Sequence, residues 1–449
     1  MTPTETRAAS SLAAVFSVRL LGLFMIYPVF ATYARNLEGA TAYTIGLALG
    51  IYGLTQGLLQ IPFGLASDRI GRKRMIVLGL TIFVAGSTIA AMSHTIMGMV
   101  LGRAIQGAGA VGSVILALVA DLTAEENRTK AMATVGITIG FSFMVAVVAG
   151  PIAASLVGVS GIFWLMVVLG VAGIAITLFV VPRTPRSAHH RDAQVTGSMF
   201  GRILRNGELL RLDFGIFALH AMLTSSFLVM PQLLKAELGI TAQQQWMVYL
   251  PVFAVAVAVM VPAIIVAEKQ RKMKAVVVSA IAAMAATQLL LVFDAHNAIG
   301  LLVAITVFFT GFNIMEATLP SLVTKTAPAE AKGTASGIYS SSQFIGIFVG
   351  GVFGGWAHKT WGDPGVFMLS SAIAIAWVVI AATMREPRYL TTRLLRVDSG
   401  ADAGSLAQSL RQVPGVAEAL VVAEEGLAYL KVDSRTFDAD AAQALPGVA

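Results

Sequence analysis

Long apolar runs separated by short polar segments follow one another along the chain from residue 12 to residue 384. A helix of about 20 apolar residues crosses the roughly 30 Å hydrocarbon core of a bilayer. Because the runs have this length and recur regularly, the pattern predicts twelve membrane-spanning helices. We place them at residues 12–34, 44–66, 75–93, 96–120, 131–156, 162–181, 213–235, 246–267, 275–293, 298–322, 333–357 and 365–384.

The composition narrows the class of protein. Of the 449 residues, 57% are hydrophobic and only 12% are charged, and the mean hydropathy is +0.79. The sequence has no cysteine, which excludes disulfides and thiolate metal sites, and no Gly-rich phosphate-binding loop. We therefore expect a protein of the lipid bilayer that is not an enzyme, with no cofactor and no metal site.

The positively charged residues lie mainly on one side of the predicted helices. The net charge is +7, and all but five of the 31 Lys and Arg residues fall in the N-terminus, the loops after even-numbered spans and the C-terminus. Cytoplasmic loops carry such an excess of Lys and Arg. The asymmetry predicts cytoplasmic N- and C-termini, and it explains the net charge without a nucleic-acid partner.

The predicted helices form two related halves. Ile61-Pro62 and Asp68-Arg69 have counterparts two hundred residues later, at Val261-Pro262 and Glu268-Lys269. Two related bundles with a site at their interface near the midplane are typical of a transporter that alternates access. We assign residues 1–183 to the first six-helix bundle, 184–211 to a cytoplasmic linker and 212–388 to the second bundle.

Residues 393–449 are more polar, and their apolar and polar residues alternate over shorter segments. The pattern predicts a strand at 394–397, a helix at 402–413, a hairpin of strands at 416–423 and 427–432, and a helix at 437–445. This βαββα order resembles the ferredoxin-like domain with its last strand truncated or missing. We expect this cytoplasmic domain to regulate the protein or to mediate self-association.

Residues 64–74, Gly-Leu-Ala-Ser-Asp-Arg-Ile-Gly-Arg-Lys-Arg, form a polar loop between the second and third spans. The loop resembles the cytoplasmic loop signature of the major facilitator superfamily. The resemblance implies that Asp68 lies at the N-terminus of the eleventh helix and that Arg72 pairs with Asp121 when the cytoplasmic side is closed. The alternative is that these charges only orient the loop. The implied conformational switch comprises Gly64, Asp68, Arg69, Gly71, Arg72, Asp121 and Arg128.

Two further segments are similar to signatures of proton-coupled members of this family. Arg103 to Gly107 resembles the Arg-x-x-Gln-Gly signature, whose arginine is associated with proton transfer. Gly150-Pro151-Ile152-Ala153-Ala154 resembles the antiporter signature but matches it incompletely. The alternative for Arg103 is a structural arginine bonded to backbone carbonyls.

Polar residues within the spans are candidates for coupling and binding. Glu316 is a carboxylate deep in the tenth span, where an unpaired charge costs roughly 3 kcal/mol or more. It should therefore be neutral or paired, which suits a proton carrier working with Arg103; the alternative is interhelical packing. The predicted substrate cavity comprises Arg19, Tyr52, Gln56, Gln60, Gln106, His220, Asn313, Tyr339 and Gln343.

Together these features predict an all-α polytopic membrane protein with the major facilitator fold of two six-helix bundles and a small α+β C-terminal domain. The resemblance implies a multi-pass protein of the bacterial inner membrane, similar to drug/proton antiporters. We expect proton-driven efflux of a small amphipathic or drug-like molecule. Two alternatives stay open: a metabolite facilitator or symporter, and a transceptor that signals through residues 393–449.

Overall fold

The computed structural model describes residues 1–182, 197–328, 331–386, 391–398, 402–422, 426–433 and 435–448. It divides into two compact units, Met1–Arg385 and Glu386–Ala449, which are considered separately. Residues 184–196 of the predicted linker, 184–211, lie outside the described residues, as does the side chain of Arg128.

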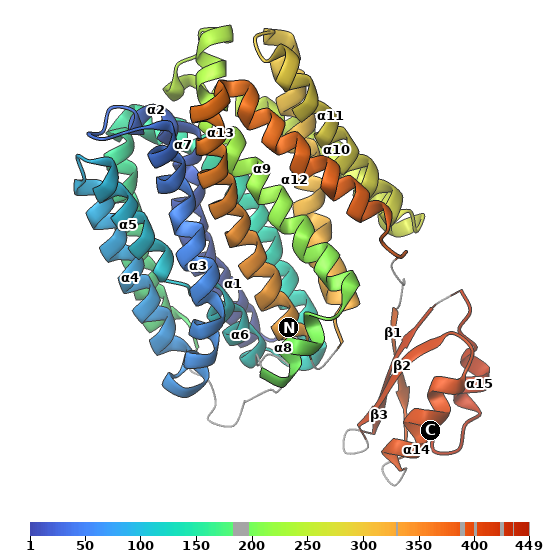
Figure 1. Cartoon of the computed structure of the whole chain (residues 1–449). Coiled ribbons are helices and arrows are strands. Elements are labelled where there is room, and N and C mark those ends of the chain that lie inside the picture. Colours follow the sequence, from blue (N-terminus) through green and yellow to red (C-terminus); the bar gives the residue numbers. More distant parts are fainter. Residues whose placement is uncertain are drawn as a thin grey trace. The chain divides into compact units, whose positions relative to one another are not determined.

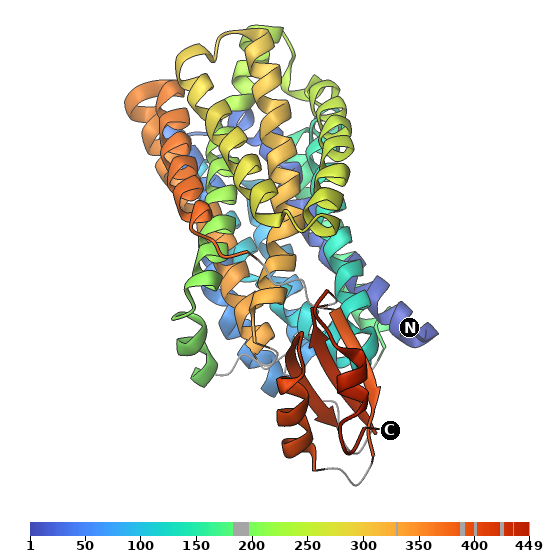
Figure 2. The ribbon, with the colours of Figure 1, turned by 90° about the vertical axis from the view of Figure 1, so that its right-hand side faces the viewer.

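Long apolar helices make up the first unit (Figures 1 and 2). Among the described residues, ten helical stretches are long and apolar enough to cross a membrane. The first half contains α1 (Pro3–Met25), α2 (Tyr27–Ala34), α3 (Ala42–Ile70), α4 (Arg72–Met92), α5 (Ile96–Ala108), α6 (Gly112–Asp121), α7 (Glu125–Ala175) and η1 (Ile176–Val180). The second half contains α8 (Gly197–Ile203), α9 (Gly207–Leu238), η3 (Ala242–Gln244), α10 (Trp246–Lys269), α11 (Met273–Asp294), α12 (Ala298–Thr326) and α13 (Lys332–Ala382).

Two of these helices each contain two of the predicted spans. Helices α7 and α13 are 51 residues long, and each is interrupted by a glycine with non-helical backbone, Gly158 and Gly362. A straight helix of that length would extend about 75 Å, more than twice the hydrocarbon thickness. Figure 1 shows the sharp bend of α13 at its upper end. The ten stretches therefore accommodate the twelve predicted spans.

The internal repeat is visible in the backbone. Gly71, between α3 and α4, has φ 101°, and Arg271, between α10 and α11, has φ 56° at the corresponding position. Gly158 (φ 70°) and Gly362 (φ 68°) also correspond between the halves. Such backbone angles are uncommon outside glycine, so their recurrence marks a shared design of the two halves.

The two halves meet along α3 and α13. A Cβ added to Gly50 would lie 2.8 Å from the Phe348 carbonyl oxygen, and one added to Gly46 would lie 3.0 Å from Gly355 Cα. One added to Gly64 would meet only Ser113 of its own half. We call the end of the bundle with residues 35–41, 239–245 and 357–363 the distal end, and the end with residues 64–74 the loop end.

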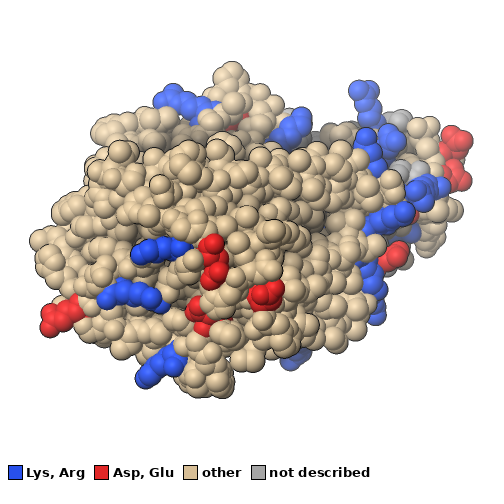
Figure 3. All heavy atoms as spheres, turned by 90° about the horizontal axis from the view of Figure 1, so that it is seen from above, with Lys and Arg blue, Asp and Glu red and all other residues tan. Residues whose placement is uncertain are grey.

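Other contacts between the halves lie at the distal end as well. There α2 packs against α9, and η3 packs against α7. Together with the close approach of α3 to α13, these contacts show that the halves are closed at the distal end. Figure 3 looks onto this end, where charged side chains are sparse. Exposed ones include Arg35, Glu38, Lys235, Asp294 and Lys359.

The second unit is a small α+β domain with the predicted order of elements. Its elements are β1 (Thr391–Arg396), α14 (Ala403–Gln412), β2 (Val416–Val422), β3 (Leu427–Val432) and α15 (Ala439–Gln443). The antiparallel sheet has the order β1-β3-β2, and a single bridge from Val448 to Val397 stands where a fourth strand would pair. Leu406, Leu410 and Val413 are buried in its core, as predicted.

Candidate transport site

The loop between α3 and α4 carries a compact ion-pair cluster. Gly71 ends α3 with a positive φ, which lets Arg72 begin α4 directly. Arg72 Nη1 lies 2.5 Å from Asp68 Oδ1, and Arg72 Nε lies 3.1 Å from Asp121 Oδ2 at the end of α6. The Ser67 hydroxyl donates to the Gly64 carbonyl at 2.6 Å. The guanidinium of Arg72 thus binds two carboxylates and holds the loop against the end of α6.

The cluster differs in one respect from its expected behaviour. The pair between Arg72 and Asp121 forms as expected, but both residues belong to the first half. Its formation therefore does not require the halves to meet at the loop end, contrary to our expectation. Arg69 is exposed. The switching role of these residues stays a prediction.

Four of the predicted cavity residues form a buried chain in the first half. Arg19 Nη2 donates to Tyr52 Oη at 2.9 Å and also to Gln56 Oε1, and Gln56 Nε2 donates to Gln60 Oε1 at 2.9 Å. All four side chains are buried, Arg19 with 2% exposure. They come from α1 and α3, so the chain links two helices of one bundle.

Arg103 joins this chain through the aromatic ring of Tyr52. Its guanidinium carbon lies 4.8 Å from the centre of the Tyr52 ring, within the range of a cation–π contact. Its Nη1 donates to Gln106 Oε1 at 2.6 Å, and Gln106 in turn donates to Ser87 Oγ at 2.8 Å. A further bond, 3.4 Å long, reaches the carbonyl of Ala48. The structure thus brings together the two buried arginines and three of the four predicted glutamines.

The first half therefore holds two buried positive charges. Among the described residues, no carboxylate forms an ion pair with Arg19 or Arg103. Within the described part of the chain, Arg19 Nε and Arg103 Nη2 have no hydrogen-bond partner. Buried charges without counterions are costly and usually functional. The first half is therefore positively charged near these arginines, whereas the Glu316 carboxylate belongs to the second half.

The second half holds a separate cluster around His220. Glu316 Oε2 lies 3.9 Å from His220 Nε2, and Gln343 Nε2 lies 2.8 Å from the same nitrogen. His220 Nδ1 lies 3.2 Å from the Ile216 carbonyl oxygen. His220 is fully buried, while the Glu316 side chain retains 18% exposure. Glu316 therefore lies beside the buried imidazole, and its side chain is partly exposed.

The hydrogen bonds assign a tautomer to His220. A carbonyl can only accept, so Nδ1 carries a proton, and Nε2 of the neutral ring accepts from the Gln343 amide. In this state Nε2 has no proton to donate to Glu316. If the ring takes up a proton at Nε2, the Gln343 amide must turn away, and His220 can then donate to the carboxylate.

The structure does not join the predicted coupling partners. Every hydrogen bond and the aromatic contact of Arg103 lie within the first half, and no bond links it to Glu316 among the described residues. Glu316 has His220 beside it instead. Asn313 donates to the Phe309 carbonyl of its own helix at 2.7 Å, and the Tyr339 hydroxyl is buried without a partner.

Aromatic rings from both halves lie beside the His220 cluster. The ring of Phe143 on α7 lies 4.8 Å from that of Phe312 and 5.9 Å from that of Phe253, and Phe312 lies 5.7 Å from the imidazole of His220. Tyr27 and Phe227 continue this contact between the halves, 5.4 Å apart. The contact between the halves is therefore apolar next to the His220 cluster.

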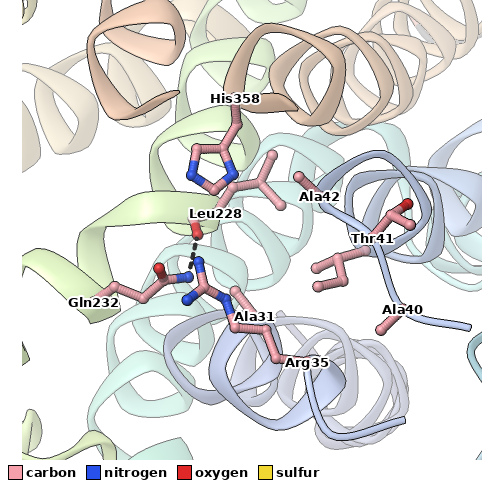
Figure 4. Close-up of a pocket in the computed structure, with 9 residues that line it drawn as sticks. Ala31, Arg35, Ala40, Thr41, Ala42, Leu228, Gln232 and His358 are labelled. Carbon is pink, nitrogen blue, oxygen red and sulfur yellow. Dashed lines mark hydrogen bonds between the residues drawn. The ribbon is translucent and has the colours of Figure 1, made fainter. Parts of the chain in front are cut away.

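A pocket of about 250 Å³ lies at the distal end between the halves (Figure 4). None of the predicted cavity residues lines it. Gln232 donates to the Leu228 carbonyl at 3.1 Å, and His358 lies 3.1 Å from Asp363. Its lining residues are Ala31, Arg35, Ala40, Thr41, Ala42, Ile45, Leu228, Gln232 and His358.

The predicted site left out two features. Asp213 on α9 is buried with 7% exposure, and its Oδ2 has no hydrogen-bond partner among the described residues. It lies seven residues before His220, a spacing that places both on one face of the helix. Phe143 could not be found, because a phenylalanine in a membrane helix gives no sign of which neighbour it meets. Among the described residues, no group of three His, Asp or Glu side chains could hold a metal ion.

Comparison with known proteins supplies the family. The model of the Major Facilitator Superfamily matches residues 12–350 and, in a second alignment, 212–414. The inner membrane transport protein YajR of Escherichia coli is 44% identical over 97% of this chain and 96% of its own length. The multidrug resistance protein MdtH of Aeromonas hydrophila is 26% identical over 87% of this chain and 94% of its own length.

Solved structures show the same fold at low sequence identity. A bacterial homologue of the human lysosomal transporter Spinster, described as inward-facing and occupied, has a TM-score of 0.65 at 15% identity and covers 85% of this chain and 96% of its own. The human organic anion transporter MFSD10 has a TM-score of 0.62 at 17% identity, covering 85% of this chain and all of its own.

Proposed function

Because the chain belongs to the major facilitator superfamily and is a multi-pass membrane transporter, we propose that it is a proton-coupled antiporter. It exports a small amphipathic or drug-like molecule by alternating access and needs no cofactor beyond the proton gradient. The observation that carries the proposal is the Glu316 carboxylate beside the His220 imidazole within the second bundle.

Glu316 and His220 are suited to carry the coupled proton. A carboxylate within a membrane helix is stable only when it is neutral or paired. Glu316 is partly exposed and lies 3.9 Å from an imidazole that is neutral in this structure, so one proton can reside on either group. Its charge would then depend on whether substrate or proton occupies the site, which is what exchange of the two requires.

The apolar contact between the halves supports an amphipathic substrate. Phe143, Phe253, Phe309 and Phe312 pack against one another, and Phe312 also contacts the imidazole of His220, which lies beside Glu316. Aromatic rings with a few polar groups are the usual lining of sites for small apolar ligands. The similarity to a multidrug resistance protein supports the same substrate class.

Alternating access gives the charged loop and the distal contacts opposite roles. We place the loop end and both termini in the cytoplasm and the distal end in the periplasm of a bacterial inner membrane, which the distribution of Lys and Arg supports. The present arrangement, closed at the distal end, then corresponds to an inward-facing or occluded state. Asp68, Arg72 and Asp121 would stabilise the opposite state by meeting the second half at the loop end.

The test is transport by purified protein in proteoliposomes, with ethidium as the probe substrate and an imposed pH gradient. Parental protein should accumulate ethidium against its gradient only when the pH gradient is present. Glu316→Gln should keep downhill exchange and lose uphill transport. Glu237→Gln, the same change near the distal end, is the control and should behave like the parent.

The result that would overturn the proposal is uphill ethidium transport by Glu316→Gln at the parental rate. A metabolite facilitator or symporter predicts no opposite proton movement. A transceptor predicts ligand binding without sustained flux. Either outcome in the parental protein would replace the antiport assignment.

A further inference from the structure

Asp213 is a buried acid that the proposed coupling site does not use. Its side chain has 7% exposure, and Oδ2 has no hydrogen-bond partner among the residues that the structure describes. Seven residues separate it from His220 along α9, which corresponds to about 10 Å on the same face of the helix. Since α9 begins at Gly207, near the loop end, Asp213 lies between that end and the His220 cluster.

Helix α13 follows α9 closely past both residues. Cβ atoms added to Gly346, Gly350 and Gly354 would meet Phe217, Ala221 and Ser225, respectively. The constant spacing shows that the two helices run parallel and in register. By this register, residue 342 of α13 lies beside Asp213. The backbone of Tyr339 is then about one helical turn closer to the loop end than that of residue 342.

Three polar groups in the second half each have a buried oxygen that has no hydrogen-bond partner among the described residues. They are Asp213 Oδ2 on α9, Glu316 Oε2 on α12 and the Tyr339 hydroxyl on α13.

The nearby charges on α9 have other partners. Arg211 Nη1 lies 2.6 Å from Glu208 Oε1, and Arg211 Nε donates to Thr383 Oγ1 at 3.1 Å. No ion pair joins Asp213 to a basic residue within the described part of the chain. A structural acid at this depth would be expected to have such a partner, because an isolated carboxylate within a span is costly.

We propose that Asp213 is a second protonation site, which passes the coupled proton between the Glu316–His220 pair and the loop end. The proposal rests on the proposed antiport. In proton-driven efflux the coupled proton leaves toward the loop end, so the Glu316 carboxyl group gives up a proton and the ionised Asp213 carboxylate takes one up. Asp213 then releases its proton to water at the loop end and is ionised again. One O–H bond breaks and one forms at each step.

The experiment measures proton flux and substrate exchange separately in proteoliposomes. Trapped pyranine reports proton movement driven by an ethidium gradient, and ethidium exchange at equal pH reports substrate movement. Asp213→Asn should keep exchange within about twofold and slow coupled proton flux by about tenfold or more, the size of effect given by loss of a positioned proton-transfer group.

Controls separate this proposal from the antiport itself. Asp294→Asn changes an exposed acid at the end of α11 and should match the parent. Asp213→Glu should recover part of the lost proton flux if the carboxyl group, and not local packing, is what matters. Coupled proton flux in Asp213→Asn equal to that of the parent, with loss in Glu316→Gln, would refute the second site and leave the antiport standing. Absence of proton flux in the parent would refute both.

Discussion

The contact between α3 and α13 makes the balance between transport states sensitive to one methyl group. In Gly50→Ala the new Cβ would lie 2.8 Å from the Phe348 carbonyl oxygen and 3.1 Å from its Cα. Carbon atoms in ordinary contact are about 3.5–4.0 Å apart, so the two backbones would have to separate by roughly 0.5–1 Å. Because α3 and α13 belong to different halves, this strain exists only while the distal end is closed.

The size of the effect follows from the cost of overpacking. Adding a methyl group to a packed contact costs about 1–3 kcal/mol. Applied to one of two states, that energy changes their ratio by about 5- to 150-fold. We therefore expect Gly50→Ala to shift the population toward the state that is open at the distal end.

The assay is the rate of labelling of a cysteine introduced at Ala40, which lines the distal pocket, with a membrane-impermeant maleimide. The chain has no native cysteine, so the signal has one source. Gly50→Ala should raise the labelling rate several-fold. Gly346→Ala is the matched control, since its Cβ would lie 2.9 Å from Phe217 Cα within the second half. It should lower thermal stability without changing the labelling rate. Equal labelling in Gly50→Ala and the parent would show that this contact does not hold the distal end closed.

Three further outcomes are expected. Asp121→Asn removes one of the two carboxylates that pair with Arg72 and should lower the free energy of unfolding by about 1–2 kcal/mol. Thermal unfolding measures this, and an unchanged midpoint would mean that the pair is not stabilising. The Glu237 carboxylate, 2.7 Å from His296 Nδ1, raises the pKa of His296 above 6.5 by hydrogen bonding to it. The stability that this bond contributes is present below pH 6.5 and lost as the pH rises through the raised pKa, so NMR titration should give a lower His296 pKa in Glu237→Gln; an identical pKa would contradict the contact. Truncation after Glu386 removes the separate C-terminal unit and should leave ethidium flux per inserted molecule unchanged, and loss of flux would give that unit a direct part in transport.

Features set by local sequence were predictable. Apolar length located the membrane helices, and Gly71 marked the turn that places Arg72 beside Asp68. The pairing of Arg72 with Asp121 followed from the family resemblance, and the core face of α14 followed from its periodicity. In each case, the responsible residues are close in sequence or belong to a known signature.

Pairings between distant helices were not predictable in the same way. Arg103 and Glu316 were expected to share a cavity, but Tyr52 and Gln106 hold Arg103 in the first half, and His220 lies beside Glu316. A single sequence shows that both residues are costly to bury, and it does not show which partner lowers that cost. Helix rotation and register decide this, and only the folded chain reveals them.

The glycines of α13 restrict how this helix can move. Gly346, Gly350 and Gly354 bring its backbone against α9, while Gly351 and Gly355 bring it against α3. Rotation about its own axis would turn side chains such as Phe348 or Phe353 into a space that admits no Cβ. Helix α13 can therefore tilt and slide between α9 and α3, but it cannot rotate about its own axis. When the transporter changes state, the two glycine faces of α13 must stay against these helices, so a bulky ligand bound between them would stop the change.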